Sequence, residues 1–110
     1  MAGKFELKKS TNDKFYFTLK AGNGEPILGS EMYEAKASAS GGIESVRKNA
    51  PLDERYVRKE SGRGEPFFVL RAGNNEPLGK SEMYSSTSAM ENGIESVKKN
   101  APDAPVVDLT

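Results

Sequence analysis

Residues 21–26 read Ala-Gly-Asn-Gly-Glu-Pro, and residues 72–77 read Ala-Gly-Asn-Asn-Glu-Pro. Shifting the chain against itself by 51 positions extends this match without a gap, from Phe5–Pro51 onto Tyr56–Pro102. Of these 47 pairs, 22 are identical, which is far more than chance provides. The chain is therefore a tandem duplication, with repeat one at about 4–55 and repeat two at about 56–110.

Each repeat carries the pattern of a β-hairpin. Apolar positions alternate with more polar ones in residues 15–21 and 66–72, and we assign the alternating set to the core: Phe17, Leu19, Ala21, Phe68, Leu70 and Ala72. The dipeptide Asn23-Gly24 favours a type I′ turn, and Pro26 suits the first residue of the returning strand. Residues 4–9 and 56–60 predict one further strand in each repeat.

A helix follows each hairpin, because apolar residues recur there at helical spacing. The two predicted stripes are Ala39, Ile43, Val46 and Ala50 in repeat one, and Met90, Ile94, Val97 and Ala101 in repeat two. Ser85 or Ser86 can cap the second helix, whereas the first has no capping side chain. Glu44–Lys48 and Glu95–Lys99 have the spacing of surface ion pairs.

Two residue types inside these helices suggest special positions. Asn49 and Asn100 suit the left-handed residue that often follows a helix end. Gly42 and Gly93 weaken a helix by about 1 kcal/mol each relative to alanine. We therefore expect both glycines to mark a close approach of helix and sheet.

Composition limits the possible architectures and locations. A chain of 110 residues suits a single domain, and halves of about fifty-five residues would each be marginal alone. There is no cysteine for a disulfide and no apolar run long enough for a membrane span. We expect a soluble cytoplasmic monomer, with residues 1–110 forming one domain around a shared core.

The duplicated blocks resemble the YegP-like family of small bacterial tandem-repeat proteins, from about Lys4 to the C-terminus. The blocks that carry the resemblance are the two Ala-Gly-Asn turns, Ser-Glu-Met-Tyr twice, and Gly-Ile-Glu-Ser-Val-Arg/Lys-Lys-Asn-Ala-Pro. The resemblance implies an α+β fold of two tandem β-β-β-α(-β) repeats that share one antiparallel sheet, with two helices packed on one face. It also implies that the strands after the helices, residues 53–56 and 106–109, are exchanged between the repeats. The family has no established activity, so no catalytic residue can be transferred.

The residues themselves argue against an enzyme. The chain has no histidine and no cysteine, which removes the commonest general base and the thiolate nucleophile. Ser-x-x-Lys occurs at Ser45–Lys48 and at Ser96–Lys99, but both copies lie near the predicted helix ends, where lysine complements the helix dipole. We expect no catalytic residue, no cofactor and no metal.

Two groups of residues remain as candidate partner-binding sites. Tyr16 and Lys20 correspond to Phe67 and Arg71, and all four point away from the helices if both helices lie on one side of the sheet. Tyr33 and Tyr84 belong to the repeated Ser-Glu-Met-Tyr segment. There, a structural interpretation packs Met32 and Met83 under the helices and leaves the tyrosines at the sheet rim.

Two functions stay open on this pattern. The first is a non-enzymatic protein-interaction module, with an unknown protein partner and no membrane. The second is weak nucleic-acid binding through Lys20, Arg71, Lys4 and Arg58 around Tyr16 and Phe67, against which the zero net charge argues.

Overall fold

The computed structural model describes residues 3–110 and contains seven strands and two α-helices. Repeat one contributes β1 (Lys4–Lys9), β2 (Phe15–Lys20), β3 (Pro26–Gly29) and α1 (Lys36–Asn49). Repeat two contributes β4 (Tyr56–Glu60), β5 (Pro66–Arg71), β6 (Pro77–Lys80), α2 (Thr87–Asn100) and β7 (Val106–Asp108). Short 3₁₀ helices cover Asp53–Arg55 and Ala101–Asp103. The elements confirm the α+β prediction.

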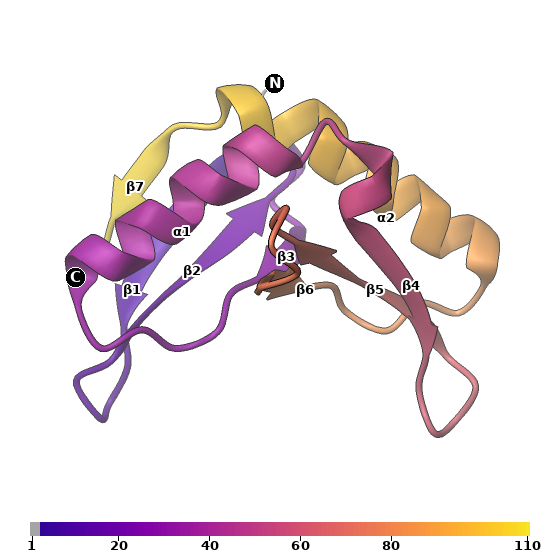
Figure 1. Ribbon diagram of the computed structural model, residues 1–110, viewed down its shortest axis with the longest axis horizontal. Coiled ribbons are helices and arrows are strands. Elements are labelled where there is room, and N and C mark those ends of the chain that lie inside the picture. The colour runs from indigo at the N-terminus through magenta and orange to yellow at the C-terminus, as the bar shows by residue number, and fades with distance from the viewer. Residues whose placement is uncertain (1–2) are drawn as a thin grey trace.

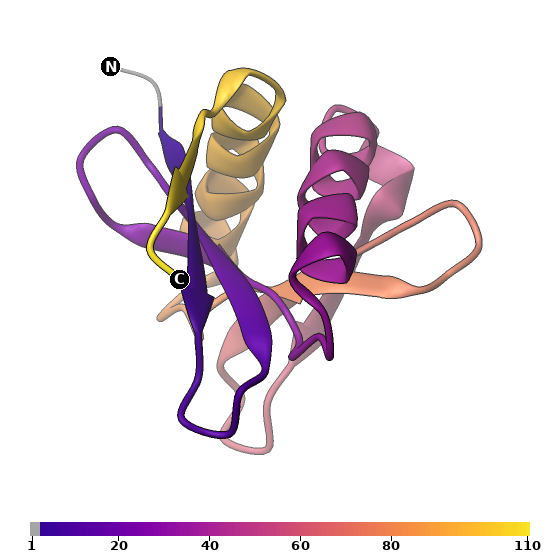
Figure 2. The same ribbon diagram turned by 90° about the vertical axis from the view of Figure 1, so that its left-hand side faces the viewer.

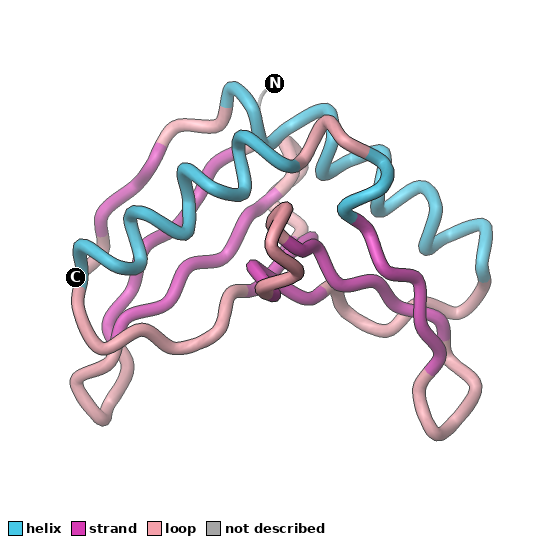
Figure 3. Tube along the Cα trace, in the orientation of Figure 1, coloured by secondary structure: helices cyan, strands magenta, loops and turns pink. Residues whose placement is uncertain are grey.

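All seven strands form one sheet in the order β4-β5-β6-β3-β2-β1-β7. The sheet bends like an arch beneath the two helices (Figure 1), and both helices lie on the same side of it (Figure 2). The loops that join β1 to β2 and β4 to β5 project away from the helices (Figure 3). One face of the sheet is therefore covered by helices, and we call the other face the underside.

The predicted exchange of strands is confirmed only for the C-terminus. β7 of repeat two lies outside β1 of repeat one and pairs with it in parallel, whereas the other strand pairs are antiparallel. The sheet is therefore mixed rather than wholly antiparallel. The expected exchanged strand at residues 53–56 is absent, because Asp53–Arg55 forms a 3₁₀ helix and the chain passes directly into β4, the first strand of repeat two.

The predicted core is confirmed except at Ala21 and Ala72, which are only partly buried at its edge, and the two repeats share it. Phe17, Leu19, Phe68 and Leu70 have no exposed surface, and both helix stripes are buried against the sheet. Each helix crosses the repeat boundary, since α1 contacts β5 and β6 while α2 contacts β3. At the boundary between the repeats, the Leu28 side chain fills the space beside Gly79. A Cβ atom on that glycine would lie only 2.8 Å from Cγ of Leu28.

The helix ends follow the sequence in part. Ser86 caps α2 by accepting a hydrogen bond from the backbone N–H of Ala89, while α1 begins after Ala35 without a side-chain cap. The expected i, i+4 ion pairs are wrong, because Glu44 pairs with Arg47 and Glu95 pairs with Lys98, one residue earlier.

The asparagines at the helix ends are the second correction. Asn49 and Asn100 do not take the left-handed conformation but close the helices as buried residues. Their side-chain amides donate to the carbonyls of Ser45 and Ser96, each over 2.8 Å. Each residue therefore satisfies a carbonyl of its own helix and leaves its side-chain oxygen free to accept a hydrogen bond from outside the helix, from Arg55 in the case of Asn49 and from Gly3 in the case of Asn100.

Candidate functional site

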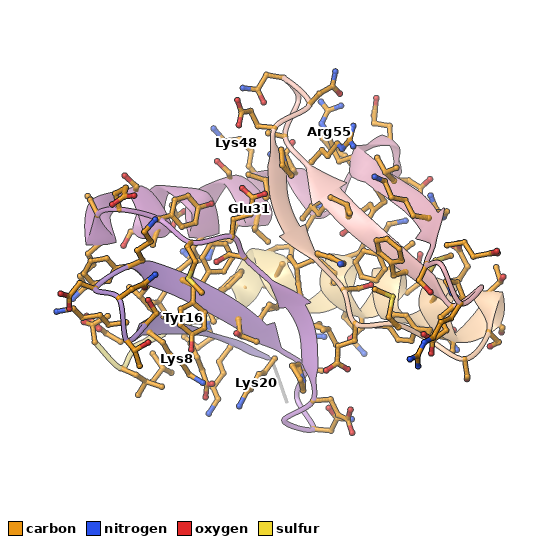
Figure 4. All side chains as sticks on the ribbon, turned by 90° about the horizontal axis from the view of Figure 1, so that it is seen from below. Lys8, Tyr16, Lys20, Glu31, Lys48 and Arg55 are labelled. Atoms are coloured by element: carbon orange, nitrogen blue, oxygen red, sulfur yellow. The ribbon has the colours of Figure 1, made fainter. Side chains whose placement is uncertain are left out.

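The underside carries the half-buried residues that alternate with the core. On β2 these are Tyr16, Thr18 and Lys20, and on β5 they are Phe67, Val69 and Arg71, as the alternation predicts. Figure 4 shows Lys8, Tyr16 and Lys20 on the underside of repeat one. The structure thus gathers four of the six candidate site residues, Tyr16, Lys20, Phe67 and Arg71, on this face.

Three lysines surround one carboxylate on the repeat-one half of the underside. The Glu6 carboxylate lies 3.0 Å from Nζ of Lys20, 3.5 Å from Lys8 and 3.6 Å from Lys4. Only 10% of the Glu6 side chain is exposed, whereas the lysines expose 28–47%. The hydrogen bond from Lys20, helped by the charge of Lys8, holds the pKa of Glu6 below its ordinary value. The cluster therefore keeps a net positive charge and presents it to solvent.

The repeat-two half of the underside is more apolar. Val57 occupies the position of Glu6, and Lys59 lies opposite Phe67. Lys80 places its ammonium 5.0 Å from the centre of the Phe67 ring, a cation–π contact. Arg71 keeps its Nε buried, and this atom has no hydrogen-bond partner among residues 3–110. This half thus combines an aromatic ring with the cations Lys59, Lys80 and Arg71.

A shallow pocket of about 250 Å³ lies where the two repeats meet. Val69 and Lys80 of repeat two form one wall, and Gly29, Ser30 and Glu31 of repeat one form the other. Its mixture of apolar surface, one carboxylate and one ammonium can accept a side chain with a polar end. The pocket adjoins Phe67, because Lys80 borders both.

Tyr33 and Tyr84 do not belong to this face. The two rings stack on core phenylalanines, Tyr33 on Phe17 at 6.2 Å and Tyr84 on Phe68 at 6.3 Å between ring centres. Burial raises the pKa of both phenols, and the neighbouring carboxylates Glu31 and Glu82 add to the shift. Both tyrosines are packing residues that extend the core beneath the helices.

The rest of the Ser-Glu-Met-Tyr segment has an equally structural explanation. Ser30 accepts a hydrogen bond from the backbone N–H of Phe17 at 2.8 Å and donates one to the carbonyl of Glu31. Ser81 repeats both bonds, with Phe68 and Glu82. The expectation that Met32 and Met83 pack under the helices is wrong, since they are 53% and 40% exposed. The tyrosines take the covered positions instead.

Arg58, one of the residues proposed for nucleic acid, lies on the other side of the sheet. Its guanidinium donates to Glu91 of α2 at 2.6 Å and to Asp53 at 3.0 Å. Lys98 also reaches Asp53, at 2.8 Å. These contacts lower the pKa of Asp53, through Lys98 first, and the pKa of Glu91, through Arg58. Arg58 is thus held in an ion-pair network that ties β4 to α2.

The sequence analysis missed Glu6, Lys8 and Lys80 as members of the underside. The signal for the first two was present, because Phe5 and Leu7 are apolar and Lys4, Glu6 and Lys8 alternate with them. Lys80 gave no such signal, since its place over Phe67 depends on how β6 lies beside β5.

Comparison with known proteins gives one consistent result. A family model described as a domain of unknown function, DUF1508, matches residues 10–56 and again residues 62–108. A UPF0339 protein of Bordetella pertussis is 54% identical over 110 residues, covering 100% of this chain and 98% of its own. The YegP protein of Escherichia coli strain K12 is 50% identical over 110 residues, with 100% of each chain covered.

Two solution NMR structures have the same fold. One is YegP of Escherichia coli, described as a protein of unknown function, with a TM-score of 0.95 and 50% identity over 100% of this chain and 95% of that one. The other is a UPF0339 protein of Shewanella oneidensis, with a TM-score of 0.94 and 50% identity over 100% and 93% of the two chains. The arrangement of the two repeats agrees among all three structures.

Proposed function

The chain belongs to the YegP-like family of tandem DUF1508 repeats, and on this premise we propose that it is a non-enzymatic protein-interaction module whose underside binds an acidic surface of a protein partner. The observation that carries the proposal is the cluster in which Lys4, Lys8 and Lys20 share the single carboxylate of Glu6. A surface of one sign attracts a partner of the other sign and orients it during the encounter.

The aromatic residues would supply the affinity that charge alone does not. Tyr16 lies beside the lysine cluster, opposite Lys8 on β1, and Phe67 lies between Lys59 and Lys80. Aromatic side chains surrounded by polar groups are the usual anchors of protein interfaces. The adjoining pocket at Val69 and Lys80 offers room for one side chain of the partner. We further propose that the module acts as a cytoplasmic monomer, in keeping with its lack of cysteine.

A matched pair of charge variants tests this proposal. Lys20→Gln with Arg71→Gln removes two cations from equivalent positions of the underside. Lys48→Gln with Lys99→Gln removes the same charge from equivalent positions on the helices. Immobilised protein and both variants are incubated with nuclease-treated bacterial lysate, and captured proteins are identified by mass spectrometry. We expect an acidic protein retained by the native chain and the helix variant but lost from the underside variant. Equal capture by both variants would refute the proposal.

Binding of single-stranded nucleic acid is the second candidate, and one observation favours it. Tyr16 and Phe67 lie among cations on an open sheet, which is the arrangement that stacks bases and contacts phosphates. Fluorescence anisotropy with a labelled oligothymidylate would measure it. A nucleic-acid complex weakens steeply as salt rises, with a log–log slope of about −0.7 for each phosphate neutralised on a single strand. A complex with a protein that survives nuclease treatment favours the first function, and because exposed lysines contribute to it, it should also weaken as salt rises.

A further inference from the structure

The polar blocks that match best between the repeats meet in space across the repeat boundary. Residues 21–23, in the turn after β2, face Glu95, Ser96 and Asn100 in the last turns of α2. Together they border an open pocket of about 330 Å³. The turn comes from repeat one and the helix from repeat two, so only the assembled pair of repeats forms this pocket.

The duplication provides a second copy of the same walls. Residues 72–74 repeat the turn as Ala-Gly-Asn, and Glu44, Ser45 and Asn49 repeat the helix residues. Lys99, which also borders the open pocket, recurs as Lys48. Asn92 is the one bordering residue that differs, being Gly41 in repeat one. The group that fills the second copy of the pocket therefore indicates which chemical group the open first copy can bind.

An arginine of the chain itself fills the second copy. Arg55 Nε donates to the side-chain oxygen of Asn49 over 3.0 Å. On its other side the guanidinium lies against the turn, where a Cβ atom on Gly73 would be 3.4 Å from Nη2 of Arg55. Figure 4 shows Lys48 and Arg55 beside this turn. The planar guanidinium is thus held between a glycine of the turn and the asparagine that ends α1.

The first copy receives no such side chain from the described part of the chain. Lys4 corresponds to Arg55 at the repeat offset, but its ammonium pairs with Glu6 on the underside, 3.6 Å away. Asn100 instead accepts a hydrogen bond from the backbone N–H of Gly3 at 2.9 Å, an interaction that leaves the space beside the turn open. The walls match those around Arg55, but no guanidinium of residues 3–110 lies between them.

Electrostatics favour a cation in the open copy. The pocket lies at the C-terminal end of α2, where the helix dipole and the last carbonyls attract positive charge. The Glu95 carboxylate at the border already pairs with Lys98 at 3.2 Å, and Lys99 lies beside it, so the helix terminus supplies most of the attraction. A planar group with several donors uses such carbonyl, carboxylate and amide acceptors better than a compact ammonium does. We propose that this pocket binds a guanidinium group from outside the chain, as an arginine side chain or as free arginine.

An NMR titration of the full chain, with residues 1 and 2 present, tests the proposal. The probe is N-acetyl-L-arginine amide, and the control is the citrulline analogue, which has the same shape but no charge. We expect shifts of the Gly22 and Asn23 backbone amides and of the Asn100 side-chain amide, with affinity about tenfold weaker for citrulline. Equal affinity for both compounds, or no shift at these residues, would refute the proposal. Shifts of the same residues on addition of inorganic phosphate instead of the probe would also refute it, because the pocket would then bind an anion.

Two further arms sharpen the result. Arg55→Ala removes the side chain that fills the second copy. The probe should then also shift the amides of Gly73, Asn74 and Asn49. If these shifts do not appear, the two copies are not equivalent. If that variant does not fold, the titration of the native chain decides alone. Titrations with free arginine and with a blocked peptide that has an internal arginine distinguish the two sources of the guanidinium group. A site for protein arginines should bind the peptide at least as tightly as free arginine.

Discussion

The ring of Tyr84 lies against Gly93 of α2 so closely that a Cβ atom on the glycine would be 2.7 Å from the ring carbon that bears the hydroxyl. Tyr33 approaches Gly42 of α1 in the same way, with 2.9 Å to the corresponding carbon. In both repeats the tyrosine of the Ser-Glu-Met-Tyr segment therefore requires a glycine in the helix above it. These pairs explain why both residues were kept in both copies.

Substitution of these glycines should destabilise the fold. Gly93→Leu forces Tyr84 out of its stack on Phe68, at a cost of about 1 to 3 kcal/mol from overpacking. The matched control is Gly41→Ala on α1, where nothing lies within 4 Å of the new Cβ. That change should raise stability by up to about 1 kcal/mol through helix propensity. Thermal unfolding of both variants gives the comparison, and a more stable Gly93→Leu variant would show that the close packing is wrong.

The shared core predicts that one repeat cannot stand alone. A fragment of residues 1–51 keeps β1 to β3 and α1 but loses β5 and β6, on which α1 packs, and β7, which covers the edge of β1. We expect no stable monomer, and at higher concentration a homodimer in which each copy supplies what repeat two supplied. Sedimentation and thermal unfolding over a range of concentrations measure this. A sharp transition of a monomer, independent of concentration, would contradict the shared core.

Glu6 should make stability depend on pH in the acid range. Its pKa is lowered in the folded state, so its contribution is complete above the unfolded value of 4.5 and is lost as pH falls through the lower folded value. Glu6→Gln should cost up to about 1 kcal/mol near neutral pH, because the three lysines that lose their shared partner are partly exposed and stay hydrated. Below pH 4.5 the difference between variant and native chain should shrink. Urea denaturation at several pH values tests this, and a difference that does not change with pH would argue against the ion-pair cluster.

Much of the fold could be read from local patterns. The alternation in β2 and β5 and the stripes in α1 and α2 assigned the core correctly, because burial acts on every second or every third to fourth residue. Gly42 and Gly93 also met the expectation of close packing. Local periodicity and the resemblance together were sufficient for these features.

Several errors concern features that depend on contacts outside the local pattern. The role of Asn49 depends on Arg55, in the 3₁₀ helix that follows α1, and that of Asn100 on Gly3, which is 97 residues away. The parallel pairing of β7 with β1 depends on where the second 3₁₀ helix directs the C-terminus. Local sequence patterns encode none of these relationships.

The turn type was wrong for a local reason. A type I′ turn needs two left-handed residues, but Gly24 alone in the first turn and Asn75 alone in the second have positive φ, of 83° and 69°. In the first turn the N–H of Gly24 donates to the carbonyl of Ala21, and that of Ala21 donates to the carbonyl of Glu25. This is a three-residue loop closed by a left-handed residue, which agrees with the register shift between Leu19 and Lys20.

The binding role of the underside is tested most directly by removing its two largest rings. Tyr16→Ser with Phe67→Ser leaves the buried Phe17 and Phe68 in place, so denaturation in urea should show a loss well below the roughly 2 to 5 kcal/mol typical of one large buried side chain. Partner capture should be abolished. Near-native stability together with unchanged capture would contradict the account, as would a loss of several kcal/mol, which would show that both rings belong to the core.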